Sequence, residues 1–195
     1  MDGAIFEIFK QYTKRYVKLT DEELDRIESV CTYKKLRKQQ YLLQEGDVWR
    51  LHAFIVRGCL RTYSIDDKGV EHIIELTIEN WWAVDRESFL TLAPSRYNID
   101  AWEDTELLVA TVADMLDMIE KIPSFGQMTR LLDQRSFIVS QRRLNSTISN
   151  TAEKRYEEFA DNHPQFIQRF PQHLIASFLG ITKETLSRIR KQAIK

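Results

Sequence analysis

Residues 171–191 read PQHLIASFLGITKETLSRIRK and predict two short helices joined by a tight turn. Pro171 suits the first turn of a helix, because the N–H that proline lacks would have no helical partner there. Gly180 falls where the first helix should stop, since glycine readily takes the left-handed conformation that ends helices. Thr182 is the expected N-cap of the second helix. One apolar face is formed at helical spacing by Leu174, Ile175, Phe178 and Leu179.

Helix pairs of this kind are typical of the helix-turn-helix, whose second helix enters the DNA major groove. Residues 181–195 carry five basic side chains and one acid, Glu184, although the whole chain has a net charge of −1. The helix dipole does not favour a cation in the first turn, where Lys183 stands. Lysine, glutamate and threonine side chains there can reach base edges and phosphates. We predict that helix 182–192 reads DNA; an ordinary amphipathic helix pair is the alternative.

The composition is that of a soluble globular protein of one large or two small domains: 195 residues, 43% hydrophobic and 29% charged. No apolar run approaches the roughly 20 residues that span a bilayer. The N-terminus lacks the basic start of a signal peptide, so we expect a cytoplasmic protein. Cys31 and Cys59 are expected to be reduced thiols. Two cysteines are too few for a four-thiolate iron–sulfur cluster.

The first 112 residues predict helices followed by an antiparallel barrel or jelly roll. Residues 4–31 look helical, with a capping box at Thr20–Glu23. Short apolar or alternating runs then follow one another, and the glycine of Asp66–Gly69 indicates a hairpin turn. The runs lie at residues 41–43, 51–56, 60–65, 70–78, 97–102 and 106–112.

Helix returns after the barrel. Asp114 is expected to cap a short helix to Lys121, and a second helix runs from Pro123 to about Asn150. A helix this long with an apolar seam usually has a partner, and we predict its copy in a homodimer. Packing on its own barrel is the alternative. The predicted dimer seam consists of Phe125, Met128, Leu132 and Val139.

The fold class is therefore α+β, in three parts. Residues 1–123 form an N-terminal antiparallel jelly roll or barrel with flanking helices, and residues 124–150 form the dimerisation helix. Residues 151–195 form a small helix-turn-helix domain that starts with a helix from Ala152 to Asn162.

This order resembles that of the Crp/Fnr family of bacterial regulators, over nearly the whole chain. The most specific part is LGITKETLSRIRK, residues 179–191, which is very similar to the recognition-helix signature of the family. Gly46-Asp47, Gly58 with Leu60-Arg61, and residues 67–69 with Glu71 match the turns of its cyclic-nucleotide-type barrel more loosely. The resemblance implies a homodimeric transcription factor, not an enzyme, whose barrel senses a small molecule. Its expected partners are double-stranded DNA, a second copy, a small-molecule effector and, as a candidate, RNA polymerase.

The resemblance also implies which residues contact DNA. Lys183, Glu184 and Arg188 match the base-contacting positions. Lys183 stands where many members have arginine. A guanidinium that can donate two parallel hydrogen bonds is thus replaced by a single ammonium group. Phosphate-facing positions are matched by Gln172, Thr185, Ser187 and Lys191, and Arg190 adds to the basic cluster.

The sensor departs from the family pattern. Members that bind cyclic nucleotides carry a Gly-Glu for the ribose and an Arg-Ser for the cyclic phosphate. This chain lacks the Gly-Glu pair. In place of Arg-Ser it has Ser95-Arg96, and this reversed order sends each side chain to the opposite face of a strand. Cyclic AMP therefore does not fit as the effector. Trp82, Asp85 and Arg96 are candidate contacts for another small molecule, and no cofactor follows from these residues.

Two rival functions stay open. A cupin-like metal-dependent enzyme would need a His-x-His pair, whereas His52 and His72 are single and widely spaced, so no metal ligand set is predicted. The other rival is a ligand-sensing interaction protein that no longer binds DNA. It rests on the end of the sequence at Lys195, without the β-hairpin wing expected after the recognition helix.

Overall fold

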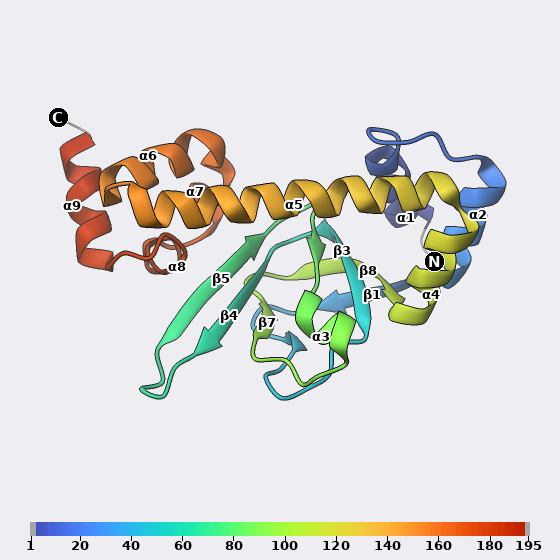
Figure 1. Cartoon of the computed structure of the whole chain (residues 1–195), viewed down its shortest axis with the longest axis horizontal. Coiled ribbons are helices and arrows are strands. Elements are labelled where there is room, and N and C mark those ends of the chain that lie inside the picture. Colours follow the sequence, from blue (N-terminus) through green and yellow to red (C-terminus); the bar gives the residue numbers. More distant parts are fainter. Residues whose placement is uncertain (1–2, 194–195) are drawn as a thin grey trace.

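The computed structural model describes residues 3–193 and has the predicted α+β architecture (Figure 1). Its strands form two four-stranded antiparallel sheets, in the orders β1-β8-β3-β6 and β2-β7-β4-β5. The antiparallel jelly roll is thereby confirmed as two facing sheets that do not close into a continuous barrel. The strands are β1 Thr32–Leu36, β2 Tyr41–Leu43, β3 Leu51–Arg57, β4 Leu60–Ile65, β5 Glu71–Thr77, β6 Trp82–Ala83, β7 Asn98–Ala101 and β8 Thr105–Thr111.

Helices lie at both ends of the molecule, and α5 runs between them as one rod (Figure 1). This helix has 27 residues and is therefore about 40 Å long. Among residues 3–193, no helix combines the length and apolar character needed to cross a membrane. The helices are α1 Gly3–Thr13, α2 Asp21–Val30, α3 Arg86–Thr91, α4 Val112–Lys121, α5 Pro123–Ser149, α6 Ala152–Asn162, α7 Pro164–Arg169, α8 Gln172–Phe178 and α9 Lys183–Ala193.

Three apolar clusters hold these elements together. The first lies between the two sheets and includes Trp49, Ile55 and Leu107. The second joins the outer face of β3 and β8 to α1, α2, α4 and the start of α5, around Phe54. The third joins β4 and β5 to the C-terminal helices, around Leu174. The jelly roll and the C-terminal helices thus share the third apolar cluster.

Several local predictions are confirmed. The hydroxyl of Thr20 accepts a hydrogen bond from the Glu23 N–H at 3.2 Å, and the Glu23 carboxylate accepts one from the Thr20 N–H at 2.8 Å, which completes the capping box. At the hairpin turn, Gly69 has φ +78° and donates to the Asp66 carbonyl at 2.8 Å. Helix α6 has the predicted bounds.

Other local predictions were wrong in detail. The N-cap of α4 is Thr111, and Asp114 donates its N–H to the Thr111 hydroxyl from inside the first turn. Pro171 is the N-cap of α8 rather than a residue of its first turn. Helices α3 and α7 were not predicted, because six residues are too few to show a helical period.

Candidate nucleic-acid interface

The turn between α8 and α9 is formed by three consecutive residues. Gly180 has φ +66°, the left-handed conformation predicted for the end of the first helix. The Ile181 N–H then donates to the Ala176 carbonyl at 3.0 Å and closes the turn. The Thr182 hydroxyl accepts from the Thr185 N–H at 3.1 Å, so the predicted N-cap of α9 is confirmed.

Two apolar side chains determine which face of α9 points outward. Leu186 is fully buried in the cluster that also contains Leu174, Ile175 and Leu179 of α8 and the turn. Ile189, three residues later on the same face, is also buried. The opposite face of α9 is therefore directed to solvent.

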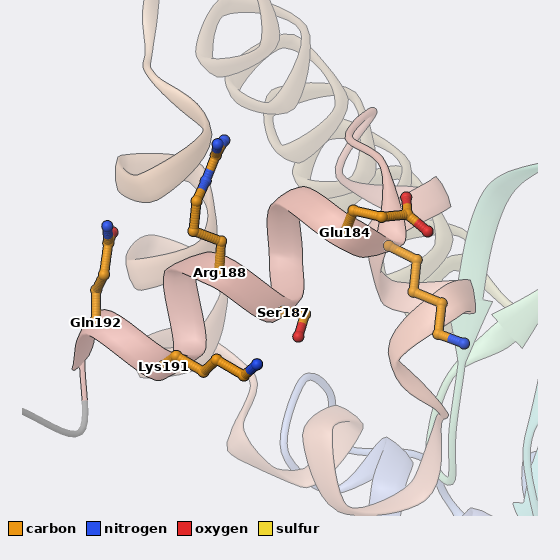
Figure 2. Close-up of a pocket in the computed structure, with 6 residues that line it drawn as sticks. Glu184, Ser187, Arg188, Lys191 and Gln192 are labelled. Atoms are coloured by element: carbon orange, nitrogen blue, oxygen red, sulfur yellow. The ribbon is translucent and has the colours of Figure 1, made fainter.

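That outward face carries most of the predicted DNA contacts (Figure 2). Its members form one shallow surface, and none of them makes an ion pair with another residue of the described chain. The cations are therefore free for an external anion. Sequence reasoning missed Gln192, which lies one helical turn after Arg188 on the same side of the helix. We call this surface the recognition face: Lys183, Glu184, Ser187, Arg188, Lys191 and Gln192.

Three predicted DNA contacts lie outside the recognition face. Thr185 is half-buried, and its hydroxyl accepts a hydrogen bond from the Thr182 hydroxyl at 3.0 Å, so it belongs to the cap. Arg190 is half-buried at the flank of α9. Gln172 is the half-buried first residue of α8.

The predicted dimer seam of α5 needs correction. Phe125 and Met128 are fully buried in the core under α1 and α4, and Leu132 packs against the same cluster. Their spacing places them on the side of α5 that covers the chain's own sheet, the alternative that the sequence left open. Phe125 and Met128 are therefore unavailable to a second copy, whereas Leu132 is only partly buried and Val139 is exposed, at 58%.

A different face of α5 is apolar and uncovered. Phe137, Leu144 and Ile148 are 63%, 62% and 77% exposed. Their spacing of seven and then four residues aligns them on one side of the helix. We call these three residues the outer stripe.

The candidate effector contacts do not converge on a common pocket. Trp82 packs outside the first sheet and donates its indole N–H to the Tyr12 hydroxyl at 3.2 Å. Asp85 is buried as the N-cap of α3. Arg96 is exposed and pairs with Glu87 at 2.9 Å. Each of the three side chains thus has a structural contact of its own.

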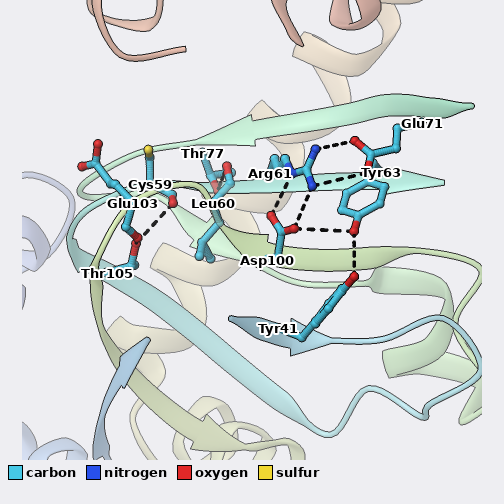
Figure 3. Close-up of polar contacts among 10 residues, drawn as sticks. All are labelled: Tyr41, Cys59, Leu60, Arg61, Tyr63, Glu71, Thr77, Asp100, Glu103 and Thr105. Atoms are coloured by element: carbon cyan, nitrogen blue, oxygen red, sulfur yellow. Dashed lines mark hydrogen bonds and ion pairs between the residues drawn. The ribbon is translucent and has the colours of Figure 1, made fainter. Parts of the chain in front are cut away.

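The loosely matching barrel residues Arg61 and Glu71 tie three strands together (Figure 3). The Arg61 guanidinium binds both carboxylate oxygens of Asp100, at 2.8 and 2.9 Å, and one oxygen of Glu71 at 2.5 Å. It also lies over the Tyr63 ring, 4.3 Å from its centroid. Each guanidinium nitrogen of Arg61 thus has a carboxylate partner, so Arg61 is not available to bind a ligand.

The side-chain carboxyl group of Glu75 has no hydrogen-bond partner among the described residues. It is half-buried and pairs in register with Thr62, on the face of β5 that looks toward the inner core. Burial raises its pKa to about 7, although Arg143 and Arg86 oppose the rise. Between pH 4.5 and 7 the folded chain therefore keeps a proton that the unfolded chain releases, so its stability falls as pH rises through that window.

Replacing Glu75 by glutamine should remove this pH dependence. A rise from 4.5 to about 7 would correspond to roughly 3 kcal/mol, and partial solvent exposure reduces our expectation to about 1–2 kcal/mol. Urea unfolding should show Glu75→Gln more stable than the wild type by that amount at pH 8 and equally stable at pH 4. The exposed Glu120→Gln is the control. Equal effects of both variants at pH 8 would contradict the burial argument.

The histidines of the enzyme alternative lie on different sheets. His52 on β3 is packed between the Trp82 and Phe89 rings, and burial lowers its pKa to about 4. His72 on β5 pairs with Asp66 at 2.9 Å. Residues 3–193 contain no group of three or more His, Cys, Asp or Glu side chains placed to hold a metal ion.

The two cysteines do not fit a thiolate-bound cofactor. Cys59 is fully buried and Cys31 is half-buried, and each packs in a different cluster. Burial raises the pKa of both thiols to about 12. They are therefore protonated at neutral pH, and because they lie in different clusters they are not placed to bind one group together.

Known proteins match the whole arrangement. The cyclic nucleotide-binding domain family matches residues 33–122. The Anaerobic regulatory protein of Haemophilus influenzae is 26% identical over 186 residues, which cover 88% of this chain and 70% of that protein. The Transcriptional activator protein anr of Pseudomonas aeruginosa is 23% identical over 187 residues, with coverage of 88% and 74%. Residues 33–122 thus match the cyclic nucleotide-binding domain family, and the chain as a whole is similar to Crp/Fnr-type transcriptional regulators.

Solved structures share the fold of this chain. FixK2 from Bradyrhizobium japonicum has a TM-score of 0.73 at 16% identity, covering 84% of each chain. The Catabolite Activator Protein of Thermus thermophilus has a TM-score of 0.54 at 22% identity, covering 89% of this chain and 83% of that one. The predicted order of jelly roll, long helix and helix-turn-helix is thus that of known Crp/Fnr folds.

Proposed function

We propose that this Crp/Fnr regulator binds a two-fold symmetric DNA site as a homodimer. The observation that carries the proposal is the recognition face. Its lysines and Arg188 point to solvent without ion-pair partners in the described chain, on a helix held at a fixed angle by Leu186. Such a helix fits the DNA major groove, with Lys183, Glu184 and Arg188 at base edges and Ser187 and Lys191 at phosphates.

The proposal divides the chain as the sequence suggested: a sensor at 1–123, a dimerisation helix at 124–150 and the DNA-binding domain at 151–195. The outer stripe supplies the apolar surface by which two copies of α5 would pair. A paired helix buries its apolar side chains and places two recognition faces about a two-fold axis. A regulator of bacterial genes acts in the cytoplasm, with RNA polymerase as its candidate protein partner and a small molecule as its candidate signal.

Arg188→Ala tests the role of the recognition face. Arginine pairs with guanine through two hydrogen bonds, so its loss should cost about 1–3 kcal/mol, roughly 5- to 150-fold in affinity, and relax the preference at one base pair of each half-site. The measurement is binding to a duplex that the wild type has selected from a random pool, at fixed salt concentration.

Arg57→Ala, an exposed arginine at the end of β3, is the matched control and should bind like the wild type. Unchanged affinity and unchanged base preference in Arg188→Ala would refute the assigned role. A wild-type chain that selects no duplex at all would favour the alternative of an interaction protein that does not bind DNA.

A further inference from the structure

The C-terminal helices pack directly on the sensor, against the outer face of β4 and β5. Helix α8 lies along β5, and the two elements share the third apolar cluster (Figure 1). Trp81 contacts the Phe166 ring, with 5.6 Å between centroids, and Trp102 lies 6.2 Å from the His173 ring. These two tryptophans thus lie at the contact between the sensor and the DNA-binding domain.

Arg169, the last residue of α7, is the main polar contact across this boundary. Its guanidinium binds Glu79 at 2.5 Å and also binds Glu103, and both carboxylates belong to the sensor. Burial works against its charge, but the two carboxylates outweigh that effect and raise the pKa of Arg169. Glu79 in turn accepts a hydrogen bond from the Gly58 N–H at 2.8 Å, so Arg169 is linked to the turn between β3 and β4.

Ser177 of α8 makes a second polar contact, with the free edge of a sheet. Strand β5 is the last strand in its sheet, so backbone groups along its outer edge lack a strand partner. The Ser177 hydroxyl accepts a hydrogen bond from the Ile73 N–H at 2.9 Å and donates one to the Glu71 carbonyl at 3.3 Å. One side chain of the DNA-binding domain thus substitutes for a neighbouring strand.

Arg143 connects the long helix to the same place. Its guanidinium donates to the Ile74 carbonyl on β5 at 2.5 Å and lies 4.5 Å from the centre of the Phe178 ring on α8. The sensor, α5 and the DNA-binding domain therefore meet at one point of strand β5.

This docking leaves the recognition face uncovered. Helix α9 lies at the far end of the molecule, with its cations free of ion pairs among the described residues (Figures 1 and 2). The contacts therefore orient the recognition helix without masking it. We propose that Arg169 with Glu79 and Glu103, together with Ser177 on the edge of β5, form an interdomain latch that holds the DNA-binding domain in the orientation needed to bind both half-sites at once.

The latch would help binding to both half-sites by raising the effective concentration of the second domain. The inference rests on the proposed function. When the first half-site is bound, the second domain is presented to its half-site at a high local concentration only if its position is restricted. Opening the latch lets each domain reorient on the sensor. Binding of one domain to one half-site does not depend on that orientation and should be unaffected.

Two variants test the latch: Arg169→Ala, which removes the charge contact, and Ser177→Ala, which removes the contact with the strand edge. In Arg169→Ala, which leaves the Ser177 acceptor of the Ile73 N–H in place, the Ile73 amide should exchange its hydrogen about 10-fold faster in the free protein, as measured by NMR. In both variants, affinity for the selected palindrome should fall roughly 10-fold or more, while affinity for a duplex with a single half-site stays within about 2-fold. Arg26→Ala, which breaks an exposed ion pair with Asp117 inside the sensor, is the control and should change neither.

The outcomes separate the latch from the function on which it rests. Higher palindrome affinity in the variants would show that docking of the domain inhibits DNA binding. Unchanged palindrome affinity with faster Ile73 exchange would show that the orientation of the domain does not matter for DNA binding. Either result overturns the latch but not the proposed function. Unchanged Ile73 exchange in Arg169→Ala would also overturn it, because the domain would then be held by other contacts. A wild-type chain that binds neither duplex contradicts the proposed function, and the latch with it.

Discussion

Exchanging Leu144 and Ile148 together for glutamate is expected to convert the proposed homodimer into monomers and to lower affinity for the palindrome roughly 100-fold or more. Both side chains belong to the outer stripe and are exposed in the single chain, so the change should not affect folding. In a paired helix they would be buried, where four unpaired carboxylates per dimer are strongly unfavourable. Loss of the dimer removes the avidity of two linked half-site contacts.

Val139→Glu is the matched control for this double variant. Val139 is also exposed on α5, at 58%, but it belongs to the seam that the sequence predicted and not to the outer stripe. Sedimentation equilibrium should give Val139→Glu about twice the 23.1 kDa of one chain, and Leu144→Glu/Ile148→Glu the mass of one chain. The opposite result would restore the predicted seam as the dimer contact, and two monomeric variants would mean that both faces take part.

Gly58→Ala is expected to lower the free energy of unfolding by about 3 kcal/mol. Gly58 has φ +95°, a conformation that costs an L-residue roughly 1–2 kcal/mol. A Cβ atom would also lie only 2.6 Å from the Thr105 Cα and 2.7 Å from the Asp104 carbonyl oxygen, both of them backbone atoms. Such overpacking typically adds about 1–3 kcal/mol.

Gly69→Ala separates the two causes. Gly69 has a similar φ, +78°, but a Cβ there would meet no heavy atom within 4 Å. It should therefore show only the conformational cost, about 1 kcal/mol. Urea unfolding of both variants measures the difference, and equal losses of stability would mean that the backbone around Thr105 yields to the methyl group.

The jelly roll, the long helix and the helix-turn-helix could be predicted because their signals are local. The capping box at Thr20, the glycines at turns and the apolar spacing of α8 each involve residues a few positions apart, which interact wherever the chain lies. The free recognition face was predictable for a related reason. A helix that buries Leu186 and Ile189 on one side must turn its opposite face outward.

The order of the elements and the chemistry of the recognition helix therefore follow from the amino-acid sequence alone. The tertiary structure decided which side of α5 is free, because the burial of Phe125 and Met128 depends on a sheet built from distant strands. It also placed Arg169 between two sensor carboxylates and Ser177 on the edge of β5. Those contacts join residues 66 to 106 positions apart, and no local pattern encodes a pairing at that distance.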